Sequence, residues 1–120
     1  MRLLKVVEAR QILNTLTNDQ YVNTRLAYWM TKFVVKTQSE QDFYIQEMQK
    51  ILAKYAQTND DGNLVVAPEN IEAFNTEVVE LENTEVEDPG IKFALSDLSS
   101  ELKLSMKQIF PLLDFIDEDK

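Results

Sequence analysis

The segment that decides the fold runs from Val22 to Tyr55 and reads VNTRLAYWMTKFVVKTQSEQDFYIQEMQKILAKY. Its apolar residues recur at steps of three and four, which places them along one side of an α-helix. The members of this stripe are Val22, Leu26, Trp29, Phe33, Tyr44, Met48, Ile51 and Tyr55. Such a helix would be about 50 Å long, twice the diameter of a compact chain of this size. The pattern therefore predicts a rod whose far end is covered by the rest of the chain or by a second subunit.

A polar interval from Lys36 to Asp42 interrupts the apolar stripe without changing its phase. Ser39 and Asp42 have the spacing of an N-terminal helix cap, which allows a break near Gln38. We expect one uninterrupted helix, and two helices joined end to end are the alternative.

Shorter elements are expected on both sides of this rod. Before the rod we expect a strand over Leu3–Val7, a helix over Glu8–Leu16, and a capping box formed by Thr17 and Gln20. After the rod we expect a turn over Thr58–Asn63, a strand over Leu64–Ala67, a helix from Pro68 to near Asn83, and a strand over Ile91–Leu95; the apolar residues that face inward from the helix are Ile71, Phe74, Val78 and Leu81. The last element is a helix that is capped by Ser105 and Gln108 and kinked at Pro111, with the apolar residues Met106, Ile109, Leu113 and Ile116. We expect the strand at Ile91–Leu95 to pair with one of the other two. The fold class is mainly α with a small β element (α+β): one long amphipathic helix, three shorter helices and two or three short strands, in a single domain over residues 1–120.

The composition narrows the chemistry. The chain has no histidine and no cysteine, which argues against imidazole bases, thiolate nucleophiles, disulfides and the usual zinc sites. Gly62 and Gly90 are too few for a glycine-rich phosphate loop. A calcium loop around Gly62 would need carboxylates at Gln57 and Pro68, so we expect no metal, no cofactor and no catalytic residue. No stretch is apolar enough for a signal or a membrane span, so we expect a soluble cytoplasmic protein.

The net charge of −9 is unevenly distributed. Residues 1–54 hold eight bases and five acids, whereas residues 55–120 hold four bases and sixteen acids. Such asymmetry favours complementary patches, within one subunit or between subunits. The simpler alternative is an acidic face that keeps the protein soluble.

Two groups of side chains are candidates for binding a partner. The first is aromatic and basic, and we expect it to form a protein interface that balances the acidic segment Glu69–Asp88. A basic stripe interleaved with an aromatic residue can also bind nucleic acid, but the overall acidity makes direct nucleic-acid binding the weaker interpretation. The candidate interface consists of Tyr21, Arg25, Tyr28, Trp29, Lys32, Lys36, Phe43 and Tyr44. The second group, a candidate acidic ridge, consists of Glu69, Glu72, Glu77, Glu80 and Glu82.

A succession of short motifs extends over nearly the whole chain. It comprises Arg25 in an aromatic-rich helix, Ile51-Leu52-Ala53-Lys54-Tyr55-Ala56, Asp60-Asp61-Gly62-Asn63, an acidic helix, Phe93-Ala94-Leu95-Ser96-Asp97-Leu98, and a closing helix after Leu104-Ser105. This succession resembles a family of small uncharacterised proteins of temperate phages and prophages of Gram-positive bacteria, often encoded near structural and lysis genes. The resemblance implies a phage accessory protein made in the host cytoplasm, and it supplies no catalytic residue.

Three functions remain open at this point. The first is an accessory protein that binds a phage or host protein through its helical face, as a homo-oligomer. The second is an inhibitor of a host defence protein, with the acidic half acting as a nucleic-acid mimic or plug. The third is a nucleotide sponge, meaning an oligomer that binds and sequesters a signalling nucleotide, with Arg25, Lys32 and Lys36 contacting the phosphates of the nucleotide.

Overall fold

Helices make up most of the computed structural model, which describes residues 1–19 and 22–117. The α-helices are α1 (Leu3–Asp19), α2 (Thr24–Lys36), α3 (Gln38–Tyr55), α4 (Ile71–Glu82), α5 (Leu95–Glu101) and α6 (Met106–Ile109), and the 3₁₀ helices are η1 (Pro68–Asn70) and η2 (Phe110–Phe115). The strands are β1 (Ala56–Thr58), β2 (Leu64–Val66), β3 (Phe93–Ala94) and β4 (Ile116–Asp117). The mainly α class with a small β element is confirmed.

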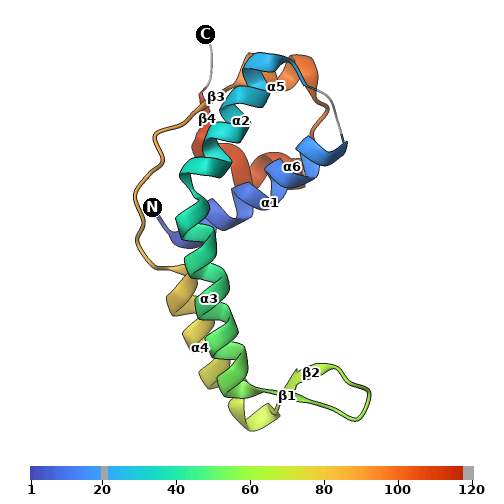
Figure 1. Ribbon diagram of the computed structural model, residues 1–120, viewed down its shortest axis with the longest axis vertical. Helices are drawn as coiled ribbons and strands as arrows, with labels where there is room; N and C mark the ends of the chain where they lie inside the picture. The colour runs from blue at the N-terminus through green and yellow to red at the C-terminus, as the bar shows by residue number, and fades with distance from the viewer. Residues whose placement is uncertain (20–21, 118–120) are drawn as a thin grey trace.

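The expected rod is present, but it is divided. Helices α2 and α3 follow one another end to end along the longest axis of the molecule (Figure 1). Thr37, with φ −104° and ψ 11°, separates them, so the uninterrupted helix was wrong and the break near Gln38 is confirmed. Helix α2 is capped by the side chain of Asn23, which accepts a hydrogen bond from the Leu26 N–H at 2.8 Å.

The predicted cap of Thr17 and Gln20 does not begin the rod. Thr17 belongs to α1, α2 begins at Thr24, and Gln20 lies outside the described residues. The Ser39 hydroxyl donates to Glu40 at 3.0 Å, and no side-chain cap bond is found at the start of α3.

The joint between α2 and α3 is held by the buried Arg10 of α1. Its guanidinium donates to the Val34 carbonyl, to Thr37 Oγ1 at 2.9 Å and to Gln38 Oε1 at 3.0 Å. The Thr37 hydroxyl in turn donates to the Phe33 carbonyl at 2.7 Å. Carbonyls in the last turn of a helix have no partner within the helix, and a cation there also interacts favourably with the helix dipole. Arg10 therefore satisfies the end of α2 and sets the point at which α3 begins.

The strand expected over Leu3–Val7 is wrong, because these residues open helix α1. Leu3, Val6, Val7 and Ala9 are all buried, and this periodicity continues through the rest of the helix. The Leu3 N–H still donates to the Thr84 carbonyl at 2.8 Å, so only the backbone at the very start of the chain pairs with a distant segment.

The pairing expected for the strands is also wrong. Strand β2 pairs with β1 in an antiparallel hairpin, and β3 pairs with β4 in parallel. The Asn59 side chain accepts hydrogen bonds from the N–H groups of Asp61 and Asn63, at 3.0 and 2.9 Å. Gly62, with φ 82°, supplies the left-handed residue of the turn. The turn reverses the chain, so β2 pairs with its neighbour β1 and not with a strand distant in the sequence.

Other local signals are confirmed. Ser105 and Gln108 form a reciprocal capping box at the start of α6, and Pro68 opens η1 directly before α4. Helix α4 ends at Glu82 with Asn83 as its C-cap. The chain beyond Ile109 continues as the 3₁₀ helix η2, which contains Pro111.

The molecule has two parts, which we call the head (residues 1–37 and 91–117) and the tail (residues 38–90). The main hydrophobic core lies in the head, where Phe33 packs against Phe93 and Phe115 with ring centroids 5.9 and 4.8 Å apart. In the tail, α3 and α4 lie side by side, and the β1–β2 hairpin forms the far end (Figure 1). A second buried cluster of Leu3, Val7, Ile51 and Leu81 joins α1 to both tail helices, so the lower half of the apolar stripe is covered by its own chain.

This arrangement is elongated. The radius of gyration is 17.2 Å, against about 14 Å for a compact chain of this length. The accessible surface is 8068 Å², against about 6,700 Å² for a compact monomer of this mass. The long dimension of 52 Å arises because the tail is built mainly of the two α-helices α3 and α4 and a hairpin.

We expect Arg10→Met to lower the free energy of unfolding by about 2 to 3 kcal/mol, because the Val34 carbonyl and Thr37 hydroxyl lose a buried donor. Urea unfolding measures the change. Arg2→Met is the matched control, since the exposed Arg2 makes only a surface hydrogen bond to Asn83 and should change stability by less than about 0.5 kcal/mol. Equal effects of the two substitutions would contradict this role of Arg10.

Candidate protein-binding surfaces

One exposed side of α2 gathers most of the candidate interface. We call it the aromatic–basic face, and its members are Arg25, Tyr28, Trp29, Lys32, Val35 and Lys36. The Tyr28 and Trp29 rings meet edge to face with centroids 5.2 Å apart, and Lys32 Nζ lies 5.8 Å from the centre of the Tyr28 ring. Trp29 was expected in the apolar stripe but is 40% exposed, because α2 buries Leu26, Met30 and Phe33 instead.

The charges of this face are only partly balanced within the chain. The Arg25 guanidinium forms a two-pronged ion pair with Asp97 of α5, so its partner is not the segment Glu69–Asp88, as had been expected. Lys32 and Lys36 make no ion pair with any residue that the structure describes. Both lysines are exposed, and Lys32 lies beside the Tyr28 ring.

The remaining candidates lie elsewhere. Phe43 of α3 is exposed beside Glu47 and Glu80, in a shallow pocket between α3 and α4. Tyr44 packs against the second buried cluster, and burial, with the nearby Glu82 and Glu8 carboxylates, raises the pKa of its hydroxyl. Tyr21 lies outside the described residues. The candidate interface is thus not one surface.

The acidic ridge is also divided. Glu69, Glu72 and Glu80 are exposed, whereas Glu77 and Glu82 are half-buried. Glu77 forms an ion pair with Lys54 of α3 at 3.3 Å. The neighbouring Tyr55 hydroxyl, together with this ion pair, lowers the pKa of the Glu77 carboxyl. Glu77 therefore joins α4 to α3 rather than contributing to an outer ridge.

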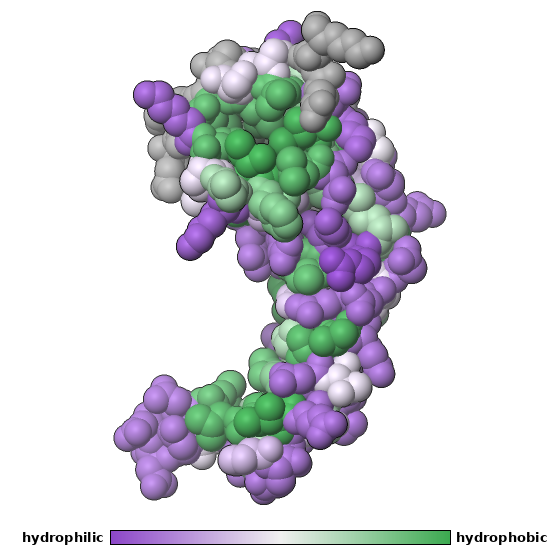
Figure 2. Space-filling view, turned by 180° about the vertical axis from the view of Figure 1, so that it is seen from behind, coloured by the Kyte–Doolittle hydropathy of each residue, from purple (hydrophilic) through white to green (hydrophobic). Residues whose placement is uncertain are grey.

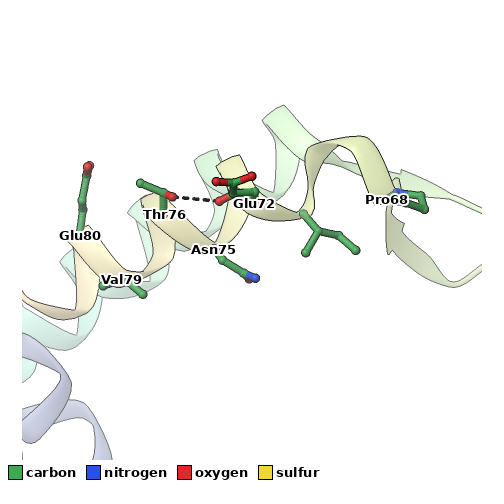
Figure 3. A pocket seen from close by; sticks show the side chains of 7 residues that line it. Pro68, Glu72, Asn75, Thr76, Val79 and Glu80 are labelled. Atoms are coloured by element: carbon green, nitrogen blue, oxygen red, sulfur yellow. Dashed lines mark hydrogen bonds between the residues drawn. The ribbon is translucent and has the colours of Figure 1, made fainter.

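The outer side of α4 instead carries an open groove between two rows of side chains. One row is Ile71, Asn75 and Val79, and the other is Glu72, Thr76 and Glu80. In the view of Figure 3, Glu72, Thr76 and Glu80 lie on one side of the α4 ribbon and Asn75 and Val79 on the other. Ile71 was expected to face inward, but it is exposed at one end of this apolar–acidic groove.

A further group of exposed apolar side chains lies at the other end of the molecule and was not recognised as a surface from the sequence. Met106 is 84% exposed, Phe110 68% and Leu113 54%. Nearby, a hollow of about 210 Å³ is lined by Leu95, Leu98, Ser99, Leu102, Leu104, Ile109 and Ile116. The view from behind shows hydrophobic side chains gathered over this part of the head (Figure 2). We call Met106, Phe110, Leu113 and the hollow the C-terminal apolar face.

Pro111 explains why the sequence pattern misled. The spacing of Met106, Ile109, Leu113 and Ile116 suits one side of a continuous helix, which would bury them together. The chain changes to the tighter 3₁₀ form at Phe110, so Met106 and Leu113 are left exposed while Ile109 and Ile116 line the hollow. The signal in the sequence was Pro111 inside an apolar run.

Two further observations concern the described residues 1–19 and 22–117. No group of three or more acidic side chains in this part of the chain is placed to hold a metal ion. None of its helices has the length and apolar character needed to cross a bilayer.

Comparisons of the sequence and the structure with models of protein families, curated proteins and solved structures find no match.

The Glu77 contacts predict a pH dependence. Because its pKa is lower in the folded chain than the ordinary value of 4.5, Glu77 stabilises the fold above that pH, and the contribution is lost as the pH falls through the folded pKa. The stability difference between the native chain and Glu77→Gln should therefore shrink between pH 7 and pH 3 in urea unfolding. Glu72→Gln, at an exposed carboxylate, is the control and should show no comparable change. A difference for Glu77→Gln that stays constant with pH would contradict the prediction.

Proposed function

We propose that this chain is a non-catalytic phage accessory protein that acts in the host cytoplasm by binding another protein, and that it does so as a homo-oligomer. The observation that carries the binding function is the C-terminal apolar face. The phage origin rests on the resemblance of the sequence motifs, from Arg25 to the closing helix.

The C-terminal apolar face has the character of a protein-binding site. Monomeric proteins rarely expose a contiguous apolar patch without a functional reason, and aromatic side chains carry a large part of the binding energy at interfaces. Here Phe110 and Met106 project into solvent, with a concave apolar hollow nearby. A matching partner would have a pocket that accepts Met106 and Phe110 and an apolar side chain that enters the hollow.

The accessible surface supports the same proposal. The chain exposes about 1,400 Å² more than a compact monomer of its mass, and a standard protein interface covers about 800 Å² per partner. Thirteen residues with large apolar side chains are exposed among those described, on both the head and the tail. One bound partner and one further copy of the chain would together cover an area of this size.

We expect the double variant Met106→Ser/Phe110→Ser to weaken binding of the partner by about tenfold or more, because two projecting anchors are removed. The measurement is quantitative affinity capture from phage-infected cells, followed by a dissociation constant for the captured protein. Folding should persist, since both side chains are exposed.

Leu64→Ser is the matched control, because Leu64 is 64% exposed but lies in the β1–β2 hairpin. It should retain the same captured protein at the same affinity. If the double variant binds as tightly as the control, the C-terminal apolar face is not the site.

A second candidate is the inhibitor of a host defence protein. The tail holds thirteen acids and two bases, and Glu69, Glu72 and Glu80 are exposed on it. Acidic side chains concentrated on one projecting part of a molecule can bind in the basic site with which a host defence protein binds nucleic acid. Reversal of these three residues to Lys should abolish inhibition of the defence protein, and unchanged inhibition would reject this candidate.

The nucleotide sponge is less well supported. Of its three proposed phosphate contacts, Arg25 is already neutralised by Asp97. A thermal-shift panel of cyclic and modified nucleotides tests it, and a flat response would dismiss it.

A further inference from the structure

The charges of the molecule are separated along its length. The head holds nine bases and six acids, whereas the tail holds two bases and thirteen acids. The aromatic–basic face lies on α2 in the head, and the apolar–acidic groove lies on α4 in the tail. Each of these two helices thus presents an outer side with exposed apolar residues and charges of one sign.

We infer that the aromatic–basic face of α2 in one copy of the chain docks into the apolar–acidic groove of α4 in a second copy. The inference deepens the homo-oligomeric state proposed above and rests on it. It assigns the two surfaces that meet and the pairs of side chains that match.

The shapes of the two faces are compatible. The α4 groove lies between two rows of side chains at four-residue steps, Ile71–Asn75–Val79 and Glu72–Thr76–Glu80. Such grooves accept a ridge of side chains at four-residue steps from another helix, with the helices crossing at about −50°. On α2, Tyr28, Lys32 and Lys36 form such a ridge.

The chemistry of the two faces also matches row by row. Tyr28 and Val35 lie along one side of the α2 face, and Lys32 and Lys36 lie beside them. Placing Tyr28 and Val35 against Ile71 and Val79 brings the two lysines beside the row that contains Glu72 and Glu80.

The unpaired charges favour this contact over the alternatives. Neither the two lysines nor Glu72 and Glu80 have an ion-pair partner among the residues that the structure describes. A contact between two heads would place basic faces together, and a contact between two tails would place acidic helices together. Only a contact between the head of one copy and the tail of another brings opposite charges together. Repulsion between like charges disfavours the other two arrangements.

The test is a charge-swap experiment. Variant A carries Lys32→Glu and Lys36→Glu, so both of its faces are acidic, and variant B carries Glu72→Lys and Glu80→Lys, so both are basic. Sedimentation velocity at low salt should show the native chain above its monomer mass of 13.9 kDa, with the association weakened at high salt because exposed ion pairs are screened. Each variant alone should remain monomeric. An equimolar mixture of A and B should regain association, which also shows that both variants are folded.

Trp29 locates the contact. It is the only tryptophan of the chain and lies on the α2 face, so association should shift its emission to shorter wavelength and reduce its quenching by acrylamide. The matched controls are Lys103→Glu/Lys107→Glu for variant A and Asp60→Lys/Asp61→Lys for variant B, which make the same charge changes at exposed positions away from both faces. Both controls should associate like the native chain.

The outcomes separate this inference from the proposed function. A native chain that is monomeric at every concentration overturns the homo-oligomer and this inference together. If the native chain associates but A and B do so equally well, or if their mixture stays monomeric, only the α2–α4 contact is overturned. Partner capture should be retained in A and B and lost in Met106→Ser/Phe110→Ser, because the C-terminal apolar face is separate from both helices.

Discussion

The buried guanidinium of Arg10 bonds both to the last turn of α2 and to the first residues of α3, and the direction of the tail depends on these bonds. Burial lowers the pKa of Arg10, but the nearby Asp42 and Glu40 carboxylates oppose this effect, and arginine stays charged in proteins. The joint at Thr37 is therefore a buried polar contact next to the hydrophobic core of the head. It allows α3 to leave the head and reach α4 without losing hydrogen bonds at the end of α2.

The separation of head and tail follows from this joint. The head closes around Phe33, Phe93 and Phe115. The tail is held by the smaller buried cluster of Leu3, Val7, Ile51 and Leu81 and by contacts between α3 and α4 such as the Lys54–Glu77 ion pair. A two-helix tail has a large surface for its mass, so many of its side chains face solvent. The basic head and acidic tail are consequently held apart on one elongated molecule, and that arrangement underlies the proposed contact between copies.

Most local signals were predictable because each depends on residues close together in the chain, although the expected cap of Thr17 and Gln20 does not begin the rod. The capping box of Ser105 and Gln108, the end of α4 near Asn83 and the turn at Gly62 all appear as expected. Signals that depend on distant partners failed. Leu3–Val7 was expected as a strand, but packing against α3 and α4 favours a helix there. Arg25 was matched to the wrong acidic segment, because charge pattern does not identify which carboxylate lies within reach.

By itself, the sequence determined the mainly helical class, the position of the rod and the unequal charge of the two halves, because these follow from helical periodicity and composition. It allowed a break near Gln38 only as the alternative to one uninterrupted helix, and the structure decided for the break. Only the tertiary structure decided which apolar residues stay exposed. Trp29 and Met106 fit buried stripes as well as Leu26 and Ile109 do, and the choice depends on which neighbours arrive to cover each side. Burial depends on the folded chain as a whole, because the residues that cover an apolar side chain and remove it from water are often far away in the sequence.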